Sequence, residues 1–353
     1  MSECWRGWTP DRHATMTSLP QASLFKIPGP KEQVLPQAEN LFKALLLLVM
    51  LFASFCGAEY LARGLDATPT SAALLKWPLI AALAIFNVVL LTGMGVLAHD
   101  AVHRVLFKSA FWNEFWGGML SAFALIPFNA NRQFHLTHHS YAHQPGLDPE
   151  NAQHHHSFIY AATVGSALAL NAQYLLLLQN FRRIGDKRHA MRTLKDVACL
   201  GAVFSIYFGL LPALGISVLH TIVPIILLFP PVFAFRALSD HYGVPAIERG
   251  DKTRREVFDV AEEAEPERRQ REVSGWVVLT SPALEWLWSH VNYHEVHHKY
   301  PYLSHRYLPQ VFAATRIEHP YLVVKGYWRS LINMRKLGYY STAEDVQSFR
   351  VGT

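Results

Sequence analysis

Cysteine is scarce in this chain, and its scarcity excludes several kinds of redox and metal chemistry. The 353 residues include only three cysteines, Cys4, Cys56 and Cys199, which lie far apart. The sequence therefore predicts no cysteine metal site and three reduced thiols. It also has no His-Pro-Gly-Gly haem-binding segment and no Gly-x-Gly-x-x-Gly turn that opens a βαβ unit. We expect any electrons that a reaction needs to come from a separate protein.

Charge is scarce as well, because charged residues make up 17% of the chain and apolar residues 51%. The apolar residues gather in blocks, at positions 45–58, 77–98, 157–178 and 197–235. A bilayer core of ~30 Å needs about 20 apolar residues in a helix, so these blocks predict membrane helices. The last block is long enough to cross twice, with Pro212-Ala-Leu-Gly215 as the turn. No removable signal peptide is expected, and no aromatic-basic pattern indicates nucleic acid.

Histidine, in contrast, is abundant and ordered into three boxes. They are His99-Asp-Ala-Val-His103, His135-Leu-Thr-His138-His139 and His294-Glu-Val-His297-His298. Residues three and four apart share one face of a helix, so we expect each box to aim its imidazoles at one point. Neutral imidazole is a common ligand of iron, zinc and copper. Eight converging nitrogens exceed the needs of one ion, so the boxes predict two metal ions.

These boxes resemble those of the membrane fatty acid desaturase/hydroxylase superfamily of non-haem di-iron enzymes, as does the stretch Asn292-Tyr-His-Glu-Val-His-His-Lys-Tyr-Pro301. The resemblance implies two iron ions, O2 as co-substrate and a fatty acyl substrate in the bilayer. It also implies an external electron donor, such as a ferredoxin or a cytochrome b5-like protein. In this superfamily a further histidine ligand often follows the fourth span, where this chain has His241; some relatives add an asparagine where this chain has Ala237.

The predicted ligand set therefore has nine members: His99, His103, His135, His138, His139, His241, His294, His297 and His298. Asp100, Asp240 and Glu295 adjoin ligand histidines, and we expect them, with Asn292 and His290, to support the ligands from behind. Asp148 and Glu150 are assigned to the turn after the second box. His143 and the run His154-His155-His156 fit no box and are interpreted as loop histidines.

The predicted fold is an all-α integral membrane protein. If one site collects all three boxes, they lie on one side of the membrane, so the chain crosses an even number of times between them. Four spans in two hairpins satisfy this, with residues 157–178 lying flat in the interface and residues 111–128 too short to cross. A cytoplasmic helical cap, which includes the charged segment 249–272, completes the site. Residues 1–40 and 341–353 are expected to be tails around one domain, 41–340.

The orientation is predicted from the basic residues, and the reaction from the resemblance. Six basic residues crowd the loop on the histidine side, which predicts a cytoplasmic site, in the inner membrane of a bacterium: Arg182, Arg183, Lys187, Arg188, Arg192 and Lys195. A fatty acid desaturase is our first expectation. A desaturase-like decarboxylase that forms terminal alkenes, a carotenoid hydroxylase or ketolase, and a non-catalytic metal-binding or sensor protein stay open. Arg132 or Arg236 would hold a free carboxylate, although both suit snorkelling basic residues.

Overall fold

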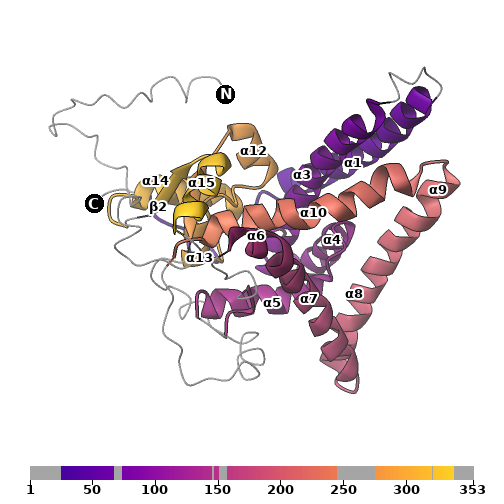
Figure 1. The fold of residues 1–353 in the computed structure, drawn as a ribbon. Coiled ribbons are helices and arrows are strands. Elements are labelled where there is room, and N and C mark those ends of the chain that lie inside the picture. Colours follow the sequence, from indigo (N-terminus) through magenta and orange to yellow (C-terminus); the bar gives the residue numbers. More distant parts are fainter. Residues whose placement is uncertain are drawn as a thin grey trace.

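The computed structural model describes residues 25–66, 74–144, 147–150, 157–244, 275–319 and 321–337 of the protein. This part of the chain is mostly helical (Figure 1). Four of its helices are long and apolar enough to cross a membrane: Gln37–Leu65, Lys76–Val102, Lys187–Ala213 and Val218–His241. The four-span fold predicted from the apolar blocks is confirmed. The charged segment 249–272 lies outside the described residues.

The first hairpin pairs α1 (Gln37–Asp66) with α3 (Lys76–Val102). Leu47, Leu51 and Phe55 of α1 are fully buried, in one core cluster with Leu90 and Leu91 of α3. The helix α3 continues several residues past its apolar block. The first histidine box therefore lies at the end of a membrane-length helix.

The second hairpin runs up through α8 (Lys187–Ser205), η3 (Ile206–Leu210) and α9 (Leu211–Ala213), and returns through α10 (Val218–His241). The turn lies where the sequence predicted it. Gly215 adopts a φ of 76°, a left-handed conformation that glycine reaches without steric cost. Ser217 then caps α10 by accepting a hydrogen bond from the Leu219 amide. The return helix ends at His241, so it also delivers a predicted ligand to the end of a span.

Between the hairpins lie α4 (Ala110–Phe123), α5 (Phe128–Tyr141), α6 (Phe158–Tyr160), η2 (Ala161–Gly165) and α7 (Ser166–Arg182). At 14 residues, α4 is too short to cross, as expected. In Figure 1, α7 runs toward the start of α8 and away from the end of the molecule that holds α9. It is not among the four membrane-length helices of the described chain. Its flat placement in the interface stays a prediction.

The remaining elements form the cap: β1 (Trp276–Leu279), α12 (Pro282–Leu287), α13 (His294–Lys299), η5 (His305–Tyr307), α14 (Leu308–Thr315), β2 (Leu322–Lys325) and α15 (Tyr327–Leu337). The two strands pair in parallel, with Trp276 opposite Leu322. The predicted helical cap thus also contains a short two-stranded sheet. Two buried runs of four residues are too short to distinguish a strand from a helix by periodicity. Figure 1 shows the cap at one end of α1, α3 and α10 and the hairpin turns at the other.

Candidate metal centre

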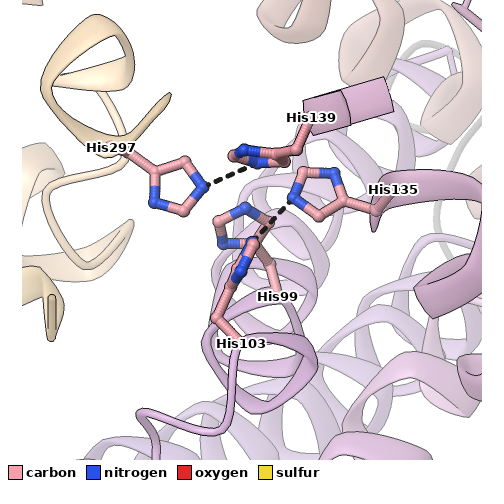
Figure 2. Close-up of side chains that lie close together, drawn as sticks. All are labelled: His99, His103, His135, His139 and His297. Carbon is pink, nitrogen blue, oxygen red and sulfur yellow. Dashed lines mark hydrogen bonds between the residues drawn. The ribbon is translucent and has the colours of Figure 1, made fainter. Parts of the chain in front are cut away.

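The structure brings all nine predicted ligands together in two groups. The first group holds five histidines, drawn from α3, α5 and α13: His99, His103, His135, His139 and His297. One ring nitrogen of each lies within 4.8 Å of the others. The Nε2 atoms of His103 and His135 are 3.0 Å apart, and those of His139 and His297 are 3.1 Å apart. Figure 2 shows these rings pointing toward one another from three elements.

The second group holds four buried histidines, from α5, α10 and α13: His138, His241, His294 and His298. The Nε2 atom of His294 lies 2.9 Å from that of His241 and 3.0 Å from that of His298. The rings of His139 and His298 stack with centroids 4.1 Å apart. The two groups are therefore immediate neighbours, in contact through the histidines of α5 and α13.

Helix geometry explains how the boxes are divided. Side chains four apart on α5, His135 and His139, enter the first group, while His138 enters the second. On α13, His294 and His298 enter the second group and His297 the first. The expectation that each box converges on one point is wrong for the second and third boxes. Adjacent residues on a helix point about 100° apart, so a His-His pair faces two points. The helices α5 and α13 lie between the groups and serve both.

The donor atoms fit metal ions. Ligand bonds of about 2.1 Å at right angles place neighbouring imidazole nitrogens about 3.0 Å apart, which is the spacing of the Nε2 pairs. Both ring nitrogens of His99 and the Nε2 of His138 are buried without a hydrogen-bond partner in the described chain. Burial and neighbouring histidines lower the pKa of five ligands well below the usual value, which favours the neutral imidazole with one ring nitrogen free to bind a metal: His135, His139, His294, His297 and His298.

Carboxylates lie behind three of the ligands. Asp148 Oδ1 is 3.0 Å from His138 Nδ1, Asp240 Oδ2 is 3.6 Å from His294 Nδ1, and Asp100 Oδ1 is 3.8 Å from His99 Nδ1. Burial opposes protonation of His138, yet Glu150 and Asp148 raise its pKa to about 9. Only Asp148 is within hydrogen-bond distance, so it can fix the ring orientation of His138 and raise the basicity of the coordinating nitrogen.

Two of these contacts differ from the sequence interpretation. Asp148 does shape the turn, because it accepts hydrogen bonds from the amides of His143 and Glu150 at 2.9 Å. It also contacts a ligand, a role that the sequence reasoning missed. His305 was missed as well; its Nδ1 lies 2.6 Å from Asp100 Oδ2. In the sequence, Asp148 and His305 are titratable residues outside the boxes. Many other residues of this chain fit that description, so the sequence does not single these two out.

Two other candidates make their hydrogen bonds to the cap instead of to a ligand. Glu295 faces away from the groups, 2.9 Å from His319 Nε2 and 3.2 Å from the Leu322 amide. Asn292 donates to the Val278 carbonyl and to Glu285. Both side chains therefore attach the third box to the cap around the β1–β2 sheet. The prediction that they support ligands from behind is wrong for these hydrogen bonds.

The remaining histidines lie outside the two groups. His290 stacks near His305, with ring centroids 6.2 Å apart, and burial together with the charges of His305 and Lys43 lowers its pKa to about 4. His143 is buried in the loop after α5, with its ring centroid 5.3 Å from that of His241. His154, His155 and His156 lie outside the described residues.

The start of α5 is fixed by a residue distant in sequence. Pro127, at the cap position of α5, has no side-chain acceptor. Asp196 of α8 takes that role: its carboxylate accepts from the amides of Asn129 and Ala130 at 2.8 and 3.1 Å, and from the Asn129 side chain at 2.9 Å. An anion at a helix N-terminus satisfies free amides and opposes the helix dipole. A membrane-length helix thus holds the helix that carries three ligands.

A cavity of about 110 Å³ opens onto both groups. Its wall includes His99 and His135 of the first group and His138, His241 and His294 of the second. Arg236 and Ala237 also line it, whereas Arg132 does not. Arg236 is 8% exposed and forms an ion pair with Asp240. Arg132 pairs with Glu114 at 2.9 Å. The wall also includes the apolar side chains of Ile126, Phe229 and Phe233.

Buried, all-histidine donor groups at the ends of membrane-length helices define a membrane protein built around a metal centre. Comparison with family models agrees: residues 75–326 match the model for fatty acid desaturase. The chain therefore belongs to the fatty acid desaturase family, whose members are di-iron oxidoreductases. A search of curated proteins finds no match.

Proposed function

We propose that the protein is an O2-dependent fatty acid desaturase of a bacterial inner membrane. The observation that carries this proposal is the cavity, whose wall combines apolar side chains with histidines of both groups. An acyl chain fits the apolar part of such a wall by its hydrophobic surface, and the lining histidines would bring its C–H bonds beside the metal ligands.

The two groups suit two iron ions, one in each, held by all nine histidines. When bound, two irons would supply the oxidising power that no side chain has, for a net reaction in which one O2, two electrons, two protons and two hydrogens of the acyl chain give two waters and a double bond. The protein positions the chain and excludes water. Asp148 would orient the ring of His138 from behind, and Asp240 and Asp100 place negative charge near His294 and His99.

The electrons would come from an external donor, because the sequence offers no second redox centre of its own. Arg182, Arg183, Lys187 and Arg188 are exposed at the α7–α8 turn. Positive residues concentrate on the cytoplasmic side of membrane proteins, so the histidine end and the cap would face the cytoplasm. Such a surface would attract an acidic ferredoxin or a cytochrome b5-like donor.

One observation favours a second candidate, the alkene-forming decarboxylation of a free fatty acid. Arg236 lines the cavity and pairs with Asp240, which lies near His294, and its Nε has no hydrogen-bond partner in the described chain. A guanidinium binds a carboxylate through paired N–H groups, which would place the first carbons of a free acid beside the ligands. The ion pair with Asp240 argues for the other interpretation, in which Arg236 orients Asp240 behind His294.

Product analysis separates the candidates. We expect gas chromatography of lipids and headspace from cells that make the protein to show new internal double bonds, and His297→Ala to abolish them. Terminal alkenes would support the decarboxylase, oxygenated carotenoids would support a hydroxylase or ketolase, and no new product would contradict an acyl-chain enzyme.

The two arginines provide a matched pair for the second candidate. If Arg236 anchors a carboxylate, Arg236→Gln should weaken turnover of free acids by roughly 2 kcal/mol or more, while Arg132→Gln, away from the cavity, should not. Equal turnover of free acids by both variants would contradict the proposal that Arg236 binds the substrate carboxylate. Iron content of both proteins serves as the control for an intact site.

A further inference from the structure

The buried side of helix α7 contains polar side chains, and its outer side contains large apolar ones. Its buried side presents Ser166, Gln173 and Asn180, spaced seven residues apart, together with Ala169 and Leu176. Its outer side presents four apolar side chains that are about half exposed: Leu168 47%, Leu175 57%, Leu178 55% and Phe181 57%. A helix that faces water shows the opposite distribution. An apolar surface of this extent on an outer face is typical of contact with lipid or a partner.

The surroundings of α7 identify lipid as the occupant of this face. Apolar exposure continues onto the neighbouring membrane-length helices, at Val197 of α8 (53%) and Leu227 of α10 (69%). The exposed basic cluster Arg182, Arg183, Lys187 and Arg188 follows at the end of α7. Apolar side chains beside a basic cluster match a leaflet edge, where acyl chains meet anionic headgroups.

The inner side of α7 forms part of the cavity wall. Ser166, Ala169, Leu170 and Gln173 line the cavity from α7, and Phe229, Pro230 and Phe233 line it from α10. Both helices therefore stand between the cavity and the lipid-facing surface. This portion of the wall is made by α7 and α10.

Both helices are irregular beside the cavity. Pro230 and Pro231 interrupt the hydrogen-bond ladder of α10, because proline has no amide hydrogen. The π-helical segment η2 precedes α7 directly, and π-helical turns interrupt regular helices at functional sites. These are the positions at which the two helices can separate with the least loss of backbone hydrogen bonding.

We propose that substrate enters the cavity from the bilayer, by passing between α7 and α10. The inference rests on the proposed function and makes it more specific. The substrate is an acyl chain already dissolved in the membrane, as a free acid or a lipid, and not a thioester handed over by a soluble carrier protein.

The first test measures what α7 touches and does not depend on activity. A benzophenone amino acid replaces Leu175 in the full-length protein, in vesicles of phosphatidylcholine and phosphatidylglycerol. The matched control replaces Ile317, which is 66% exposed on the cap. After irradiation, mass spectrometry should find phospholipid adducts at position 175 and not at 317. Equal labelling at both positions, or none at 175, would overturn the lipid contact of α7 even if the desaturase activity is real.

The second test measures entry. Leu170→Trp enlarges a half-buried side chain of the inner wall, and Leu168→Trp makes the same change on the outer face. For substrate supplied in vesicles, the first variant should raise KM about tenfold, as overpacking of a buried wall implies, with iron content kept. The second should leave KM unchanged. Unchanged KM in both variants, or faster turnover of a carrier-bound thioester than of the membrane-dissolved chain, would contradict lateral entry.

Discussion

At the scale of single residues, the spacing of the histidines predicts most members of the two groups. His99 lies in the last turn of α3 and His103 at its C-terminal cap, and the structure places both in one group. The division of His138 from His139 could be argued from helix geometry, but which group each joins depends on where α10 and α13 lie. The roles of Asp148 and His305 could not be read from the sequence, because they arise from contacts across turns and between α3 and the cap.

The carboxylates give a prediction at this scale. Asp148→Asn removes the charge behind His138 Nδ1 and should weaken iron binding about 10- to 100-fold, the usual effect of losing such a partner. Glu295→Gln is the matched control, since Glu295 contacts His319 and the Leu322 amide instead of a ligand. Chelator competition on purified protein measures both. Iron loss in the Glu295 variant equal to that in the Asp148 variant would show that the contact with His138 is not what matters.

At the scale of elements, the four long helices followed from apolar length, whereas their attachments did not. Pro127 gives no sign of how α5 begins, because the capping carboxylate comes from Asp196 on another helix. The β1–β2 sheet likewise joins Trp276 to Leu322, and a parallel pairing over that separation has no local signal. Local sequence predicts an element; contacts between distant elements decide how it is held.

Removing the cap of α5 tests this attachment. Asp196→Ala leaves buried amides of Asn129 and Ala130 unpaired and should lower the free energy of unfolding by about 1–3 kcal/mol. Asp186→Ala removes an exposed cap of α8, which accepts from the Arg188 amide, and should cost about 1 kcal/mol. Thermal unfolding in detergent, on iron-free protein, compares the two. A smaller loss for Asp196 than for Asp186 would contradict the role given to this contact.

At the scale of the whole molecule, two hairpins share one end that holds the histidines and another that is joined by polar contacts. Glu59 of α1 lies 3.0 Å from His220 of α10 and accepts from the Ser217 amide at 2.9 Å. The number of spans could be predicted from composition, and the sidedness from parity. The order in which the helices pack could not, because apolar faces alone do not select their partners.

Sidedness gives a prediction for the molecule as a whole. Reporter fusions after residues 30, 110, 190 and 345 should all report the cytoplasm, and fusions near residues 67 and 215 should report the opposite side. Even crossing between the boxes and the positive-inside rule both require this result. An external signal at residue 190 would mean that the stretch ending in α7 spans the membrane.

The metal content of the purified protein tests the central claim most directly. Elemental analysis should find about two irons per chain and little zinc, because two neighbouring all-histidine groups each suit one ion. Replacing His154, His155 and His156 together should leave that content unchanged, while His138→Ala or His297→Ala should lower it. A single tightly bound zinc, or full iron content after loss of His138 or His297, would contradict the account.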